Sequence, residues 1–468
     1  MKCQSIVAGT FIIALALDVL AAQPERTGIR RSPETDAALG NRFTDQEAAL
    51  LDEVQQACFL YFWREVGAGG LAKDRKLAPV ASIAAVGFQL SALPIGVERG
   101  WITRQEGEHR ARTILRTLLE REDNKKFGLY YHYLDLDTGG QSKTGYEVVV
   151  STVDSALLMA GAIPAAEYFG GEIKTMVDRL LGAANWKVFA TGPGGELSMG
   201  WQPKDPQRPT GEGEFLNVHW NQAGDEERLV YFLAAAAPEP DHVVDPRLYY
   251  RIRRVVKRHK DMPPFVVTPQ GSLFSYLFSH CWIDYRTLGL DDPARLNVDT
   301  VPVDWFENSR RAVLTHRQRC LEQKGRFKTL ADDRWGLSAC AARDGYIVPE
   351  IQPNIIDKDR WYEGTVAPYA AVASIMFVPR ESLAAIHAFR ELKDAQGRPL
   401  IWRDPAEGGY GFVDAFNLDQ GFVSDDYVGI DQGPMLLAIE NARTGLIWRL
   451  FANHEMVRRG LERLCLVR

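Results

Sequence analysis

The sequence lacks the features that mark several large classes of protein. Its 55 Lys and Arg residues are outnumbered by 61 Asp and Glu residues, the formal net charge is −6, and there is no basic stripe. This balance argues against nucleic-acid binding and is compatible with a neutral ligand. No Gly-x-Ser-x-Gly elbow, His-Glu-x-x-His helix or Walker loop occurs. The motifs of serine hydrolases, zinc proteases and P-loop enzymes are therefore missing.

Metal-ligand spacing is missing as well, and the six cysteines do not point to a disulfide framework. The nine histidines are scattered and the cysteine spacing fits no zinc pattern, so we expect no metal and no cofactor. Cys3 lies in the N-terminal apolar segment, and an odd number of cysteines remains, which leaves at least one thiol unpaired. We expect buried, apolar thiols at the remaining positions, which are Cys58, Cys281, Cys320, Cys340 and Cys465.

Only the N-terminus carries an apolar run that indicates targeting. Lys2 is followed by an apolar segment at 6–17 and by small residues up to 22. This order is typical of a secretory signal peptide, and the run is shorter than the roughly 20 residues of a membrane span. We therefore expect a signal peptide at 1–22, a flexible lead-in at 23–43 and one domain at 44–468. The mature protein would be periplasmic or secreted and would not contact a membrane.

Helical periodicity dominates the rest of the chain. Capping boxes at Thr44–Glu47 and Thr103–Glu106 begin two helices. Nearly apolar helices such as 81–93, typical of burial on all sides, alternate with amphipathic ones. The only strand candidates are 128–133 and 265–268. This pattern predicts an all-α toroid of inner and outer helices with long functional loops. The expected helices are 44–62, 81–93, 103–121, 151–166, 226–237, 308–323, 365–376, 380–392, 433–443 and 446–464.

The loops are rich in acidic, amide and aromatic side chains. Segments 198–226, 276–286, 364–371, 409–417, 430–434 and 439–448 combine these groups, often beside Gly or Pro. Aromatic faces with polar neighbours are typical of a sugar-binding cleft, although most of the eleven Trp residues are expected in the core. Glycosidic hydrolysis needs two carboxyl groups, one protonated and one ionised. The candidates at loops or helix starts are Asp154, Glu226, Asp414 and Asp431.

Two of these acids admit more than one interpretation. Glu226 begins an apolar helix, where an apolar edge raises a carboxyl pKa as a general acid requires. It is also one of three consecutive acids, with Asp225 and Glu227, which a helix dipole favours without any catalytic role. Asp414 lies between Phe412 and Phe416 in a Gly-rich turn without a local cation. Its alternative role is to cap the next helix.

Together these segments resemble the glycoamylase-like family, which includes bacterial endo-β-1,2-glucanases of glycoside hydrolase family 144. The resemblance extends from Ala48 to Leu464. Its ordered matches are 62–65, 70–75, 82–88, 96–101, 151–158, 279–286, 308–310, 335–338 and the C-terminal segments 364–371, 409–417, 430–434 and 439–448.

The resemblance implies an (α/α)6 toroid and an endo-acting, inverting hydrolase of β-1,2-glucan. On matching positions, Glu226 resembles the general acid, Asp414 the general base and Asp154 a substrate-binding acid. The expected partner is a neutral glucan or oligosaccharide. The other predicted substrate-binding residues are Asp74, Arg75, Trp201, Trp220, His280, Trp282, Asp284, Arg286, Tyr410 and Asp431.

The chain departs from the family pattern near the proposed acid. The family usually places Tyr two residues before this Glu, where this chain has Gly224, and the Glu before segment 151–154 is shifted to Glu147. Segment 202–225 is also reshaped. Asp225 and Glu227 are therefore rival acids. The alternatives are an exo-acting hydrolase of short β-1,2-gluco-oligosaccharides and a non-catalytic glycan-binding protein.

Overall fold

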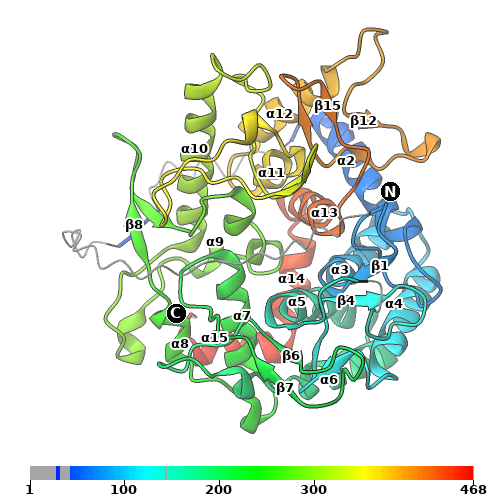
Figure 1. The fold of residues 1–468 in the computed structure, drawn as a ribbon, viewed down its shortest axis with the longest axis vertical. Coiled ribbons are helices and arrows are strands. Elements are labelled where there is room, and N and C mark those ends of the chain that lie inside the picture. The colour runs from blue at the N-terminus through cyan, green and yellow to red at the C-terminus, as the bar shows by residue number, and fades with distance from the viewer. Residues whose placement is uncertain (1–27, 32–42, 143–144, 467–468) are drawn as a thin grey trace.

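The computed structural model describes residues 28–31, 43–142 and 145–466, and they form an (α/α)6 toroid (Figure 1). Six inner segments form a central ring: α3 (Ile83–Glu98), α5 (Thr152–Phe169), α7 (Asp225–Ala236), the 3-10 pair η3 (Leu273–Tyr276) and η4 (Ser279–Cys281), α11 (Pro368–Ala373) with η7 (Ser374–Met376), and α13 (Gly429–Arg443). In this ring α3 contacts α5 and α13, α5 contacts α7, η4 contacts α7 and α13, and α11 contacts α13.

Amphipathic helices surround this ring. They are α2 (Asp45–Arg64), α4 (Arg104–Leu119), α6 (Gly171–Ala183), α10 (Trp305–Gln323) and α12 (Pro379–Glu391). The shorter helices are α8 (Arg247–Arg251), α9 (Tyr285–Leu288), α14 (Leu446–Asn453) and α15 (Glu455–Arg463), with 3-10 turns η1 (Trp186–Phe189), η2 (Pro240–His242), η5 (Pro293–Leu296), η6 (Tyr362–Gly364) and η8 (Pro405–Glu407). None of the described helices is long and apolar enough to cross a membrane.

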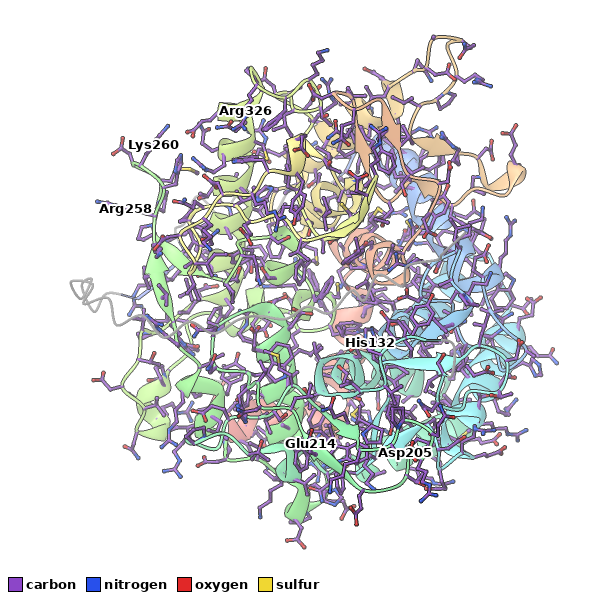
Figure 2. The ribbon with its side chains drawn as sticks, in the orientation of Figure 1. His132, Asp205, Glu214, Arg258, Lys260 and Arg326 are labelled. Atoms are coloured by element: carbon purple, nitrogen blue, oxygen red, sulfur yellow. The ribbon has the colours of Figure 1, made fainter. Side chains whose placement is uncertain are left out.

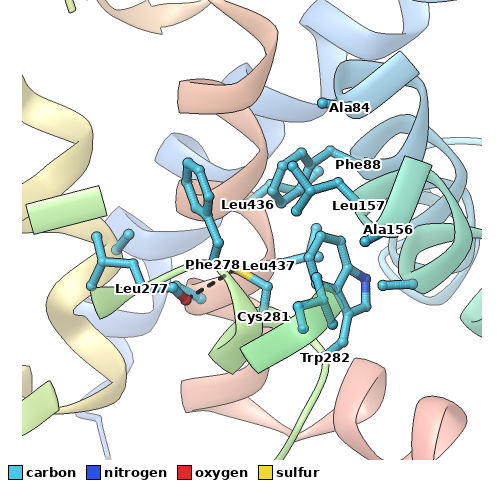
Figure 3. Close-up of a cluster of buried hydrophobic side chains, with 14 of the residues drawn as sticks. Ala84, Phe88, Ala156, Leu157, Leu277, Phe278, Cys281, Trp282, Leu436 and Leu437 are labelled. Carbon is cyan, nitrogen blue, oxygen red and sulfur yellow. Dashed lines mark hydrogen bonds between the residues drawn. The ribbon is translucent and has the colours of Figure 1, made fainter. Parts of the chain in front are cut away.

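Burial separates the two layers as the apolar pattern predicts. Helix α3 is buried continuously from Ile83 to Gly96, whereas the outer helix α4 buries one stripe that includes Ala111, Ile114 and Leu118. Both predicted capping boxes are present: the Thr44 and Thr103 hydroxyls accept hydrogen bonds from Glu47 N and Glu106 N. The apolar inner faces meet in the core that Figure 3 shows, where the Phe88 and Trp282 rings lie 4.9 Å apart.

Strands are short and antiparallel, and none of the described sheets has more than three of them. The pairs are β1 (Val80–Ser82) with β4 (Tyr133–Asp135), β2 (Lys125–Lys126) with β3 (Leu129–Tyr130), β8 (Val255–Lys257) with β9 (Phe265–Val267), β10 (Cys340–Ala342) with β11 (Gly345–Ile347), β12 (Trp402–Arg403) with β13 (Gly411–Phe412), and β14 (Phe416–Asn417) with β15 (Phe422–Val423). The three-stranded sheet joins β5 (Val150–Ser151), β6 (Gly200–Pro203) and β7 (Gly213–Phe215). Both strand predictions are confirmed.

Two expectations from the sequence are wrong in detail. The single helix expected at 446–464 is two helices, because His454 leaves the helical conformation and caps α15 with its side chain. The lead-in is not flexible throughout: Ile29 is buried and its backbone pairs with Pro302 and Asp304. Burial of an apolar side chain outweighs the polar composition around it. The predicted signal peptide lies outside the described residues.

The α3–α5 contact allows no side chain at two glycines. A Cβ at Gly161 would lie 1.9 Å from the Gly87 carbonyl oxygen, and a Cβ at Gly87 would lie 2.3 Å from the Leu157 carbonyl oxygen. Such distances force the backbones apart. The closest pair of inner helices therefore depends on glycine in both partners.

Replacing Gly161 with Ala is expected to lower the free energy of unfolding by about 2 kcal/mol, because the inner helices must separate. Gly182→Ala is the matched control: it lies in outer helix α6, and a Cβ at this position would meet nothing closer than 3.8 Å. That change should be neutral or stabilising by up to about 1 kcal/mol. Urea denaturation of both variants checks this, and equal effects would contradict the packing argument.

Candidate active site

Three of the candidate acids occupy the first turns of inner helices. Asp154 is the third residue of α5, Glu226 the second of α7 and Asp431 the third of α13. The free N–H groups and the dipole at a helix N-terminus favour negative charge there. Backbone hydrogen bonds connect the starts of α13 and α3 to neighbouring loops: Gly429 N donates to Asp74 O, and Ile83 N donates to His132 O. One rim of the toroid thus collects the carboxyl groups.

Glu226 is the best general acid of the three consecutive candidates. Burial raises its pKa well above the ordinary value, and the neighbouring charges of Glu227 and Asp154 raise it further. A carboxyl that holds its proton near neutral pH has the protonation state that a general acid requires. The helix dipole explains why Glu226 lies at a helix start, but it does not explain the raised pKa of its carboxyl.

Asp225 has a different environment. Its carboxylate is fully buried, pairs with Arg228 and accepts hydrogen bonds from Ser279 N at 2.5 Å and Ser279 Oγ at 2.7 Å. The Arg228 guanidinium lies 3.9 Å from the Trp305 ring centre. Asp225 therefore anchors the start of α7 to η4, and its oxygens are occupied by protein donors.

The Glu227 carboxyl occupies the space beside Gly224, the position at which the family usually has Tyr. A Cβ at Gly224 would lie 2.2 Å from Glu227 Oε2. Burial raises the pKa of Glu227 to about 7. A larger residue at position 224 is incompatible with this placement of the carboxyl. The departure from the family pattern thus gives Glu226 an acidic neighbour.

Asp414 and Asp431 form a second buried acid centre. Asp414 Oδ2 accepts a hydrogen bond from Ala341 N at 2.6 Å. Burial raises the pKa of Asp414 to about 6, and burial together with the charge of Asp414 raises the pKa of Asp431 well above its ordinary value. Asp414 thus ionises first while Asp431 keeps its proton. The capping alternative for Asp414 is wrong, since α13 has Val428 at its N-cap.

The loop before β1 adds charge of both signs to this rim. Arg75 Nε lies 3.1 Å from Asp74 Oδ2, and the guanidinium lies over the Tyr346 ring at 5.5 Å. Burial opposes the charge of Arg75, yet Asp74 and Asp426 raise its pKa. Arg75 in turn favours the ionised form of Asp414. One arginine therefore balances several buried acids.

Several predicted substrate-binding residues have structural partners. Trp220 Nε1 donates to Thr152 Oγ1 at 2.8 Å and so supports the start of α5. Tyr410 donates to Glu65 Oε1 at 2.7 Å. Trp201 is buried in strand β6 and packs closely on Gly213. Their roles as substrate-binding residues stay predictions.

Segment 279–286 begins beside Asp225 at the start of α7 and leads away from the acidic rim. His280 is buried and bonds Ser309 Oγ, while the Trp282 indole donates to Ser91 Oγ. Asp284 and Arg286 line a cavity of about 410 Å³ with residues 441–445. These residues form the C-terminal end of α13, and a helix of 15 residues is about 22 Å long. Asp284 and Arg286 therefore lie at the opposite end of α13 from Asp431, whereas the cleft roles of His280 and Trp282 stay predictions.

The structure adds rim residues that the sequence did not single out as a group. His132 contacts Glu147 and Asp154, and Asp426 and Tyr346 lie near Arg75. In the sequence Glu147 had a signal through its shifted position, and His132 lies in the strand candidate 128–133. Among the described residues no three His, Cys, Asp or Glu side chains are grouped to hold a metal ion.

Asp414→Asn is expected to stabilise the protein at pH 8 and to leave its stability unchanged near pH 4. The folded-state pKa of Asp414 lies above the ordinary 3.8, so the folded state holds an extra proton between these values and loses stability as the pH rises toward 6. The expected gain at pH 8 is on the order of 2–3 kcal/mol. Denaturation at both pH values measures it. Exposed Asp344→Asn is the control, and a gain that does not depend on pH would contradict the argument.

Comparisons with known proteins place the sequence in a family. The Glycoamylase family model, described as "Putative glucoamylase", matches residues 217–455, just over half of the chain. An exo β-1,2-glucooligosaccharide sophorohydrolase (non-reducing end) of Parabacteroides distasonis is 29% identical over 92% of this chain, and the match spans 59% of that relative's length.

Solved structures give the same fold. A β-1,2-glucanase of Parabacteroides distasonis is 26% identical with a TM-score of 0.73, covering 90% of this chain and 60% of that one. An endo-β-1,2-glucanase of Chitinophaga pinensis is 24% identical with a TM-score of 0.75, covering 89% and 98%. The family match and these folds have one consequence: the chain belongs to the glycoamylase family.

Proposed function

We propose that this protein is a glycoside hydrolase that cleaves β-1,2-glucan or its oligosaccharides. The observation that carries the proposal is the pair of acid centres on the toroid rim. Burial and the charges of Glu227 and Asp154 raise the pKa of Glu226 well above its ordinary value, and the pKa of Asp414 is raised to about 6. Glycosidic hydrolysis requires this division between two carboxyl groups. The linkage follows from the names of the curated relative and of the solved glucanase.

In this mechanism Glu226 donates its proton to the glycosidic oxygen of the leaving sugar. Asp414 accepts a proton from the water that attacks the anomeric carbon from the opposite face, so the configuration inverts. In this proposal Asp154 and Asp74 bind sugar hydroxyls. The neighbouring Asp431 lowers the pKa of Asp414 and so favours its ionised form. Each proton thus moves between a named carboxyl and the reacting oxygen.

The place and mode of action are parts of the same proposal. The predicted signal peptide supports action in the periplasm or outside the cell, which fractionation of cells expressing the full chain tests. The family resemblance supports endo cleavage, whereas the curated relative is named as an exo-acting enzyme that releases sophorose. The reshaped segment 202–225 contributes the hairpin β6–β7 near α5, where chain-length preference would be set.

Glu226→Gln should lower turnover of β-1,2-glucan at least about 100-fold, because the leaving oxygen then lacks its proton donor. An aryl β-sophoroside with a good leaving group should lose far less activity. Glu391→Gln, which changes an exposed glutamate of outer helix α12, is the control and should retain full turnover, whereas Glu227→Gln should lose less than Glu226→Gln. Near-full activity of Glu226→Gln, or loss only with Glu227→Gln, would refute the assignment. Binding of glucan without hydrolysis by the unmodified protein would support the non-catalytic alternative.

Product chromatography distinguishes the two modes of cleavage. An endo-acting enzyme incubated with long β-1,2-glucan should release a ladder of oligosaccharides from the earliest times. An exo-acting one should release a single short product while the polymer stays long. Parallel incubations with β-1,3- and α-1,4-glucans test the linkage. Release of sugars only from these glucans would overturn the proposal.

A further inference from the structure

A histidine connects two acidic side chains on the rim. His132 Nδ1 lies 2.7 Å from Glu147 Oε1, and His132 Nε2 lies 3.6 Å from Asp154 Oδ1. The imidazole stacks on the Tyr133 ring at 3.8 Å. Its backbone bonds Val149 O and the first N–H of α3. Figure 2 shows His132 beside the central ring. The contacts with Glu147, Asp154 and Tyr133 therefore hold the imidazole ring in place.

We propose that His132 is a positioning residue that bridges Glu147 and Asp154 and holds the Asp154 carboxylate ionised beside Glu226. This inference rests on the proposed function, because it concerns how the acid Glu226 keeps its proton. His132 contacts neither reacting carboxyl in this arrangement. It acts through Asp154.

The charges around His132 favour its protonated form. Burial disfavours a charged imidazole, but Asp154, the hydrogen bond to Glu147 and the more distant Asp74 raise the pKa of His132 to about 9. Both ring nitrogens then carry hydrogens, one directed to each acid. Arg75, across Tyr133, is the nearby cation and already pairs with Asp74.

The imidazolium in turn determines the state of Asp154. Burial raises the pKa of Asp154, and the acids Glu147 and Asp74 add to that rise. The charge of His132 and the Ser151 hydroxyl act in the opposite direction. Without the imidazolium, burial and the acidic neighbours remain, so Asp154 would take up a proton at a higher pH.

Asp154 extends this effect to the proposed acid. Its charge is one of the causes that raise the pKa of Glu226, alongside burial and Glu227. Loss of the His132 charge should therefore protonate Asp154 and lower the pKa of Glu226. The charge of Glu147, whose side chain is one-third exposed, thus influences Glu226 through His132 and Asp154.

The bridge is tested first by NMR titration of the unmodified protein with labelled histidine, using His132→Gln to assign the signal. The His132 pKa should lie well above 6.5 and fall by about one unit in Glu147→Gln, which loses a charged partner. It should fall further in Glu147→Gln/Asp154→Asn. An unchanged titration in these variants would overturn the bridge. This measurement needs no substrate, so it stands even if the proposed hydrolysis fails.

The consequence for catalysis is tested by the pH dependence of kcat/KM on β-1,2-glucan. In His132→Gln the alkaline limb should move down by about half a unit or more, because Glu226 loses proton affinity, while the acid limb, which reports the base Asp414, should stay in place. His109→Gln changes an exposed histidine on α4 and should leave both limbs in place. A lower plateau with unmoved limbs would mean a merely structural role and would overturn the proposal.

Discussion

The active rim depends on the common direction of the inner helices. Helices α5, α7 and α13 each place a carboxyl within their first three residues, at Asp154, Glu226 and Asp431. Their free N–H groups and dipoles reduce the cost of burying negative charge. The loops that precede these helices form the short sheets, and these carry the remaining rim residues. The architecture and the acidic site therefore have one origin.

Burial then distributes protons among these acids. A carboxyl that loses water favours its neutral form unless a cation or hydrogen-bond donors compensate. Glu226 and Asp431 have little compensation and keep their protons, whereas Asp225 pairs with Arg228. Asp414 is intermediate, with one backbone donor and a protonated neighbour. Differences in local partners separate acids of similar chemistry into distinct roles.

Tight packing of the inner ring fixes these positions. The close contact of α3 and α5 at Gly87 and Gly161 holds Asp154 in place relative to the loop before α3. The Trp220 indole supports the same helix start through Thr152. At the other end of the ring, α14 contacts α5 and α15 contacts α7. Stability and site geometry thus depend on the same helices. The acids of the site are buried by this packing, which disfavours their charged forms.

The sequence by itself determined the layers of the fold and singled out the two acids proposed for catalysis. Apolar periodicity marks α3 and α5 as inner helices because complete burial needs apolar residues all around, and ordered motifs marked Glu226 and Asp414. Only the tertiary structure decided which neighbours these acids have. His280, Trp282, Asp284 and Arg286 look like cleft residues along the chain, yet they lie in the core or at the far end of α13. His132 lies in a strand candidate of the sequence, but its role could not be predicted, because its partners are Glu147 and the start of α5. The apolar periodicity of a segment predicts how its helix is buried. Contacts between loops that are distant in sequence set the pKa values of the acids, and these contacts cannot be predicted from local patterns.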